Sequence, residues 1–183
     1  MFLHLSSMSV LVALRRCLVP AAAALWMSMT TAAVAGGGPI GIDHEWSYSS
    51  GALWQRGNQL GLEYGVVATE VVSALWYGND TELGHTFFQA LDASAISAVA
   101  AQGLKYGFGR ARPNAEQGPD QWSGGGQSFP SGEVALQASF VTPFIVSYGR
   151  KDPWVWSLEA LPIYDAVARM KVQADLQTDV LAG

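Results

Sequence analysis

Three short stretches of the chain combine side chains that suit the chemistry of an anion. The first, KYGFGRARP, contains Lys105 and Arg112 with six residues between them, and its glycines let the backbone approach a ligand closely. The second, FPSGE, ends in Ser131, Gly132 and Glu133, directly before an apolar stretch of helical character. Cationic side chains and the free N–H groups at a helix start both attract anions. These two stretches therefore predict an anion-binding site.

The third stretch, ARMKVQADLQTD, places Arg169, Asp175 and Asp179 at spacings of six and four residues. A phosphoryl group in transfer spreads negative charge over its equatorial oxygens. Guanidinium groups bind such oxygens in pairs, and a lysine adds a compact positive charge. The residue types of the three stretches are thus the ones that phosphoryl transfer needs.

In order and spacing, the three stretches resemble the signature motifs of the type 2 phosphatidic acid phosphatase and vanadium haloperoxidase superfamily, which are K-x6-RP, PSGH and SR-x5-H-x3-D. The resemblance extends from about residue 85 to the end of the chain. It implies that Lys105, Arg112 and Arg169 form a cationic clamp on the phosphate. It also implies that Ser131 and the backbone of Gly132 donate hydrogen bonds to the phosphate. It implies neither a cofactor nor a metal.

The chain departs from these motifs at both catalytic histidines. Asp175 stands where the family has its nucleophile, Glu133 where it has the acid that protonates the leaving group, and Ala168 replaces a serine. Asp179 matches the aspartate that orients the nucleophile. A carboxyl group with a raised pKa can act as a general acid, and a carboxylate can attack phosphorus. The resemblance thus implies that Glu133, Asp175 and Asp179 are catalytic, although the three could instead hold a divalent cation beside the phosphate.

The other histidines are not expected to replace the missing nucleophile. His85 precedes a predicted helix that ends near Lys105, and a continuous helix would separate the two by ~30 Å. His44 lies in an N-terminal segment that the sequence does not place. The site is therefore expected to work with carboxylates.

Helices are expected to position the three stretches. Apolar residues recur at helical spacing over residues 58–78, and Asp80 is the expected cap of a second helix that runs to about Lys105. Ser131 is the expected cap of a helix that ends at about Tyr148. The first stretch thus follows one helix, and the second opens another.

A further helix is expected to begin at Asp152 and Pro153, a good pair of cap and first-turn residues, and to restart or kink at Pro162. Thr178 or Asp179 is the expected cap of another helix, which the terminal TDVLAG would leave incomplete. The sequence contains no strand pattern of useful length. It therefore predicts an all-α fold, a helical bundle of the phosphatidic acid phosphatase type 2 and haloperoxidase kind that lacks its last helix.

Residues 113–130 form an unusually long stretch without a periodic pattern. Loops of this length are often lids or binding loops. Trp122 in its centre could cover a substrate or could anchor the loop to the surface, and the sequence leaves both interpretations open.

Residues 1–35 have the pattern of a secretory signal peptide. Arg15 and Arg16 precede a run of apolar and small residues that ends in AVA, and cleavage is expected after Ala35. The alternative is an uncleaved membrane anchor, because residues 17–42 carry no charge. The single cysteine lies in this leader, so no disulfide is expected in the phosphatase-like domain, residues 36–183.

The composition narrows the class of function. Fifteen Asp and Glu against ten Lys and Arg give a formal charge of −5, which becomes −7 without the two leader arginines. So acidic a chain is no general nucleic-acid binder. Seven of its eight remaining bases lie between Lys105 and Lys171, which indicates a focused anion site. The longest uncharged run after the leader, residues 134–149, contains Pro143 and is shorter than the about 20 residues of a membrane span.

Together these features predict an exported hydrolase, a phosphatase of the periplasm or the medium that acts on phosphomonoesters or lipid phosphates. The alternative is an inactive relative that binds a phosphate or phospholipid in the same pocket. A haloperoxidase with vanadate in place of phosphate is disfavoured by the absence of a histidine at Asp175. An accidental match in an unrelated bundle is the remaining interpretation. The expected partner is a small phosphorylated substrate or a lipid head group, reached at a membrane surface through Trp122 and its loop.

Overall fold

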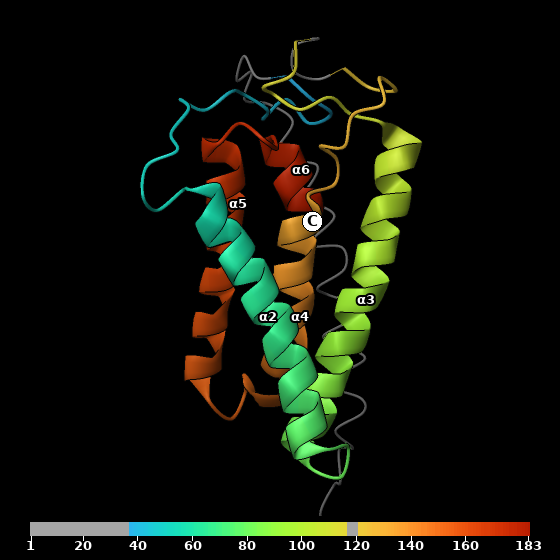
Figure 1. Ribbon diagram of the computed structural model, residues 1–183, viewed down its shortest axis with the longest axis vertical. Coiled ribbons are helices and arrows are strands. Elements are labelled where there is room, and N and C mark those ends of the chain that lie inside the picture. The colour runs from blue at the N-terminus through green and yellow to red at the C-terminus, as the bar shows by residue number, and fades with distance from the viewer. Residues whose placement is uncertain (1–36, 117–120) are drawn as a thin grey trace, which may run out of the picture. The chain divides into compact units, whose positions relative to one another are not determined.

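The computed structural model describes residues 37–116 and 121–183, so the predicted signal peptide lies outside the described residues. Helices make up 64% of this part of the chain, which contains no strand, so the all-α prediction is confirmed. None of its helices combines the length and hydropathy that a bilayer span requires. The elements are α2 (Arg56–Tyr77), α3 (Glu82–Phe108), α4 (Gly132–Tyr148), the 3₁₀ helix η2 (Pro153–Glu159), α5 (Ala160–Lys171) and α6 (Gln177–Ala182) (Figure 1).

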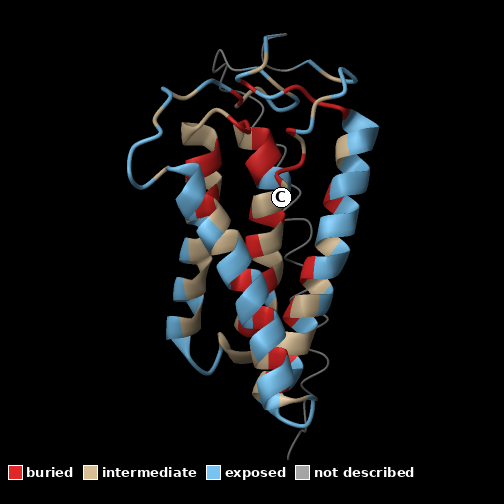
Figure 2. Ribbon diagram, in the orientation of Figure 1, coloured by how far each residue is buried: buried red, intermediate tan, exposed pale blue. Residues whose placement is uncertain are grey.

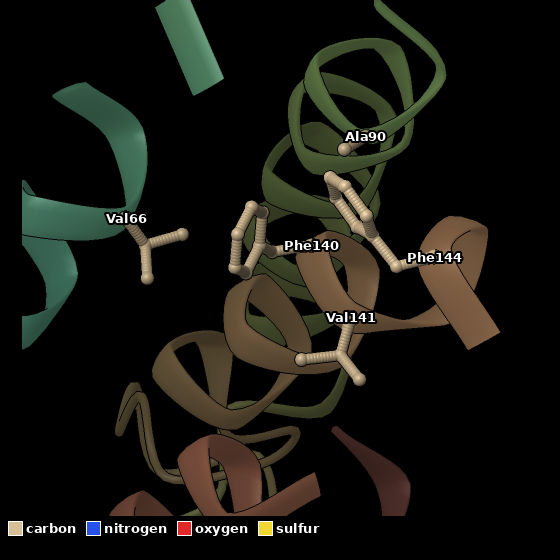
Figure 3. Close-up of a cluster of buried hydrophobic side chains, with 5 residues drawn as sticks. All are labelled: Val66, Ala90, Phe140, Val141 and Phe144. Carbon is tan, nitrogen blue, oxygen red and sulfur yellow. The ribbon is translucent and has the colours of Figure 1, made fainter. Parts of the chain in front are cut away.

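The apolar helix α4 is the centre of the bundle. It packs against α2, α3, α5 and α6, and buried positions concentrate where these helices face one another (Figures 1 and 2). Phe140, Val141 and Phe144 of α4 form the core with Val66 of α2 and Ala90 of α3 (Figure 3). Burial of a large apolar side chain contributes roughly 1.5–3 kcal/mol. This core fixes α4, and with it the helix start at which the predicted site lies.

A tight turn joins α2 to α3. Gly78 ends α2 with a φ of 64°, a conformation that glycine adopts without steric cost. Thr81 caps α3, and not the predicted Asp80: the Oγ1 of Thr81 accepts a hydrogen bond from the N–H of Gly84 at 3.0 Å. Both residue types are good caps. The geometry of the turn decides which of the two side chains reaches the first turn of the helix.

The segment after α4 follows the sequence-based expectation. Asp152 caps η2, because its carboxylate accepts a hydrogen bond from the N–H of Trp154 at 3.0 Å. Helix α5 then begins at Ala160, and Pro162 lies in its first turn. A proline needs no N–H partner there. The predicted restart of the helix at this proline is therefore confirmed.

Helix α6 begins earlier than the sequence indicated. It starts at Gln177 with Leu176 in the cap position, so the prediction that Thr178 or Asp179 caps it is wrong. Asp179 lies in the first turn, and its carboxylate accepts a hydrogen bond from the N–H of Leu176 at 2.7 Å. An acidic side chain in the third helical position can reach back in this way.

We expect Gly84→Ala to destabilise the fold, because a β-carbon there would overlap the backbone carbonyl of Gly78. Overpacking of this kind costs about 1–3 kcal/mol. Gly103→Ala on the same helix is the matched control, since a β-carbon at Gly103 meets nothing within 4 Å. Alanine there should stabilise the helix by up to about 1 kcal/mol. Thermal unfolding followed by circular dichroism measures both, and equal shifts of Tm would contradict the packing of the turn.

Candidate anion-binding site

The start of α4 brings together side chains from distant parts of the chain. Ser131 occupies the N-cap position and is buried. Lys105, in the last turn of α3, passes over Gly132: its Cε lies 3.5 Å from where a β-carbon on that glycine would be. The Nζ of Lys105 donates to the carbonyl of Gln127 at 2.6 Å. Arg169, in the last turn of α5, is also buried.

Asp175 joins Ser131 to Arg169. Its Oδ2 accepts hydrogen bonds from the Oγ of Ser131 at 2.8 Å and from the Nε of Arg169 at 2.9 Å. All three residues are buried. Ser131 stands at the predicted helix start but makes no side-chain cap bond, because its hydroxyl donates to Asp175 instead. Two of the predicted phosphate ligands thus already bind a carboxylate.

Glu133 connects Arg169 with a second arginine, Arg56, that sequence analysis missed. The carboxylate of Glu133 accepts from the Nη1 of Arg56 at 2.7 Å and pairs with the Nη1 of Arg169 at 3.0 Å. The side chain of Arg56 is 49% exposed and that of Glu133 16%, so this ion pair is the solvent-facing side of the group. Arg56 lies 77 residues before Glu133 and outside the basic stretch of the sequence, so no spacing signal pointed to it.

Arg112 is exposed and acts on the site from its edge. It borders an open hollow of about 400 Å³ lined by the loop residues Ala111, Asn114, Ala115, Glu116, Gly124, Gly125, Gly126 and Gln127. Burial lowers the pKa of Lys105; Asp175 opposes this shift, and the positive charges of Arg112 and Arg169 add to it. The charges of both arginines therefore act on Lys105. Arg112 lies in the loop, however, and it is Arg169 that binds the buried carboxylate of Asp175.

Asp179 belongs to a second buried network, which is centred on Arg110. The Nη1 of Arg110 donates to the Oδ1 of Asp179 and to the Oγ1 of Thr178, both at 2.6 Å, and its Nη2 pairs with Asp43. Burial opposes the charge of Arg110, but Asp43 and Asp179 outweigh it and raise the pKa of the guanidinium. Asp179 also accepts a hydrogen bond from the hydroxyl of Ser128. This network ties the N-terminal segment to α6 and to the loop before α4.

Of the two arginines in the first stretch, the structure buries the one that sequence analysis passed over. Arg110 is fully buried, whereas the motif spacing singled out the exposed Arg112. Nothing in the local pattern indicates which of the two faces inward. Asp179 accepts hydrogen bonds from Arg110 and from the N–H of Leu176, and it thereby fixes the backbone next to Asp175.

The three carboxylates that could have held a cation are paired with arginines. Glu133 and Asp175 bind Arg169, and Asp179 binds Arg110. Across residues 37–116 and 121–183, no three acidic, histidine or cysteine side chains lie together as metal ligands would. The arrangement therefore gives no support to the alternative of a divalent cation.

Trp122 is packed as an anchor of its loop. Its ring lies 5.8 Å from that of Phe108 and 5.4 Å from that of Phe129, measured between centroids. The guanidinium of Arg110 lies 4.7 Å from the centroid of the indole, a distance at which a cation is attracted to the face of the ring. Of the two interpretations of Trp122, the structure therefore favours the anchor.

The hydrogen bonds of His85 and His44 go to residues other than Glu133 and Asp175. His85 lies in the first turn of α3, where its Nδ1 is 3.0 Å from the Oδ1 of Asn79, and this unbroken helix of 27 residues separates it from Lys105. The backbone N–H of His44 donates to the side chain of Gln177 at 3.0 Å. The position of His85 agrees with the prediction that a continuous helix separates it from Lys105.

Asp165 is a further carboxyl group near Arg169 that sequence analysis missed. It lies four residues before Arg169 on α5 and is buried. Burial, followed by the charges of Glu133 and Asp175, raises the pKa of Asp165 to about 7, although Arg169 opposes the shift. Residues four apart share one face of a helix, so the spacing from Arg169 was the signal that could have revealed this acid.

Comparisons of the chain with protein families, with curated proteins and with solved structures found no match.

We expect Arg110→Ala to destabilise the protein by about 3–5 kcal/mol, because it leaves two buried carboxylates without their cation. Arg112→Ala, in the same loop, is the matched control, and a surface substitution of this kind changes stability by no more than about 0.5 kcal/mol. Urea unfolding followed by circular dichroism measures both free energies of unfolding. Similar losses in the two variants would show that the Arg110 network does not hold the loop and α6 in place.

Proposed function

We propose that this protein is an exported phosphatase-like protein, a helical bundle of the phosphatidic acid phosphatase type 2 kind, that hydrolyses phosphomonoesters or lipid phosphates at the start of α4. One observation carries the proposal. Ser131 and Arg169, which come from two of the three predicted motifs, both donate to one oxygen of an anionic group beside the first turn of α4. That anionic group is the carboxylate of Asp175.

A phosphoryl group would use the same donors. Its oxygens accept charge-assisted hydrogen bonds as a carboxylate does, so Ser131 and Arg169 would turn from Asp175 to the substrate. The N–H groups of Gly132 and Glu133, in the first turn of α4, have no partner within the helix and add a partial positive charge. Lys105 adds a full charge from α3. These groups form the proposed phosphate clamp.

Hydrolysis would proceed through Asp175 and Glu133. The carboxylate of Asp175 attacks phosphorus while the bond from phosphorus to the ester oxygen breaks, and Glu133 gives its proton to that oxygen. Water then attacks the aspartyl phosphate, which releases inorganic phosphate, frees Asp175 and returns a proton to Glu133. Asp179 supports this step from a distance, because it holds the N–H of Leu176 next to Asp175.

A phosphate-binding protein without turnover is the second candidate, and the contacts of Glu133 favour it. Its carboxylate accepts from Arg56 and pairs with Arg169. Both oxygens of Glu133 thus already have cationic partners, at 2.7 and 3.0 Å, and these ion pairs would have to break before the side chain could serve a leaving group. In this case the clamp would hold a phosphate or a phospholipid head group without cleaving it.

The place of action follows from the predicted signal peptide. We propose that the protein acts in the periplasm or outside the cell, either free or tethered by an uncleaved leader. Phosphorylated small molecules and lipid head groups at a membrane surface are the substrates within reach there.

Turnover of a chromogenic phosphate ester decides between the two candidates. For a phosphatase, we expect hydrolysis by the natural protein and a loss of at least about 10³-fold in kcat for Asp175→Asn, which keeps the shape but loses the nucleophile. Asp92→Asn, at an exposed site on α3, is the matched control and should retain full activity. A silent natural protein that gains turnover in Asp175→His would support the binding protein.

Titration with inorganic phosphate and with vanadate tests the clamp by itself. We expect Lys105→Gln and Arg169→Ala to weaken binding by about tenfold or more, because each removes a charge-assisted contact that contributes about 1.5–3 kcal/mol. Arg150→Ala, an exposed arginine beyond the end of α4, is the control and should bind as the natural protein does. Unchanged affinity in both Lys105→Gln and Arg169→Ala would rule out the proposed clamp.

A further inference from the structure

A second layer of buried polar residues lies one helical turn deeper than the ion pair of Glu133 and Arg169. Gln137 follows Glu133 by four residues on α4, and Asp165 precedes Arg169 by four residues on α5, so each stands on the same helix face as its partner. Gln137 and Asp165 are both only 1% exposed. The apolar core begins with Phe140, in the next turn of α4. The bundle thus contains a polar layer between its anion site and its core.

Three atoms of this layer have no hydrogen-bond partner in the described part of the chain. They are the Oδ2 of Asp165 and both amide atoms of Gln137. More than about nine in ten buried polar groups are paired, because an unpaired one keeps its full desolvation cost. Buried polar sites of this kind commonly hold a water molecule that makes about three hydrogen bonds. The layer therefore offers a site for a hydrogen-bonded water and for a proton on Asp165.

The charges around Asp165 come from four parts of the fold. Arg56 of α2 and Glu133 of α4 act on it, together with Arg169 of its own helix and Asp175 of the segment before α6. Glu63 of α2 also senses Glu133, Arg56 and Arg169, and burial and Glu133 raise its pKa.

Acidic groups outnumber basic ones in this cluster. Its four carboxyl groups belong to Glu63, Glu133, Asp165 and Asp175, and its three cationic groups to Arg56, Lys105 and Arg169. Full ionisation would leave an excess of one negative charge in a largely buried space. Retention of a proton reduces this excess, and Asp165 is the most deeply buried of the four acids.

We propose that Asp165 is protonated beneath the anion site and is hydrogen-bonded to a water that it shares with Gln137. The neutral acid thereby keeps Arg169 available to an incoming anion. While Asp165 is neutral, Arg169 has only Glu133 and Asp175 to neutralise it, and an external anion can replace either of them. When Asp165 ionises, it competes for Arg169 and repels the anion. Asp165 is thus a positioning residue that makes anion affinity depend on pH, an inference that rests on the proposed function of the α4 site.

The sign of the effect follows from the environment of Asp165. Burial and the neighbouring carboxylates raise its pKa from 3.8 to about 7. The neutral form therefore dominates below pH 7 and is lost as the pH rises above it. Since one proton is involved, anion affinity should fall by up to about tenfold for each pH unit above this value.

Infrared spectroscopy of the ligand-free protein tests the proton directly. At pH 6 the natural protein should show a carbonyl band of a protonated carboxyl group that disappears at pH 9. Burial raises the pKa of Glu63 and Glu70 as well, so the band is compared between variants. We expect Asp165→Asn to lose part of the band that the natural protein shows at pH 6, and Asp92→Asn, an exposed control on α3, to keep all of it. A band of unchanged intensity in Asp165→Asn would overturn the assignment of the proton to Asp165.

Calorimetric titration with sulfate tests the coupling, because sulfate remains a dianion across this range whereas phosphate itself titrates. We expect the natural protein and Asp92→Asn to bind sulfate at pH 6 and to lose about tenfold or more in affinity at pH 8.5. Asp165→Asn, which resembles the neutral acid, should keep its affinity at both pH values. A parallel loss in Asp165→Asn would overturn the coupling.

The two measurements separate this inference from the proposed function. If none of the three proteins binds sulfate at either pH, the clamp at α4 and the coupling are both overturned, while the infrared band still decides whether Asp165 holds the proton. If sulfate binds at pH 6 and its affinity in the natural protein does not change with pH, the clamp stands and the role of Asp165 is overturned.

Discussion

The site depends on the burial of Arg169. A guanidinium group removed from water costs several kcal/mol of desolvation unless carboxylates compensate for it, and here Asp175 and Glu133 do so at 2.9 and 3.0 Å. These two acids come from the segment before α6 and from the first turn of α4, so a single compensated charge on α5 sets the relative positions of three helices. Ser131 completes the group with its hydrogen bond to Asp175. Without Asp175, no hydrogen bond would link the buried Arg169 to Ser131 at the start of α4.

A second buried arginine, Arg110, has a different role near the start of α4. It has two carboxylate partners, Asp43 and Asp179. The second oxygen of Asp43 accepts a hydrogen bond from the backbone N–H of Thr178, and that of Asp179 accepts one from the hydroxyl of Ser128. The two networks meet at Ser131, whose backbone N–H donates to the carbonyl of Asp179 at 2.9 Å. The Arg110 network is fully buried and links the N-terminal segment to α6, whereas the group around Arg169 reaches solvent through Arg56 and Glu133. The group with a solvent-facing edge is the one that can exchange an internal carboxylate for an external anion.

Glu133 lies at this solvent-facing edge of the group. A negative charge in the first turn of a helix is favourable by itself, because it faces the positive end of the helix dipole. In this protein it also bridges the half-exposed Arg56 and the buried Arg169, so an incoming anion would meet an internal anion already bound to the clamp. The same side chain is thus the proposed proton donor and the first competitor of the substrate, and the protons held by its neighbours influence which role it takes.

The sequence by itself determined the helices and part of the site. Apolar periodicity and local caps such as Asp152 are interactions between residues close in the chain, and the structure follows them; Ser131 also stands at the helix start where it was expected. The choice of Thr81 over Asp80 and the entry of Arg56 and Arg110 into the site were decided by the tertiary structure alone. The first depends on how a turn bends, and the others depend on which charges lie together once the helices pack. The spacing of residues along the chain does not predict these ion pairs, because the fold decides which carboxylate lies next to each buried arginine.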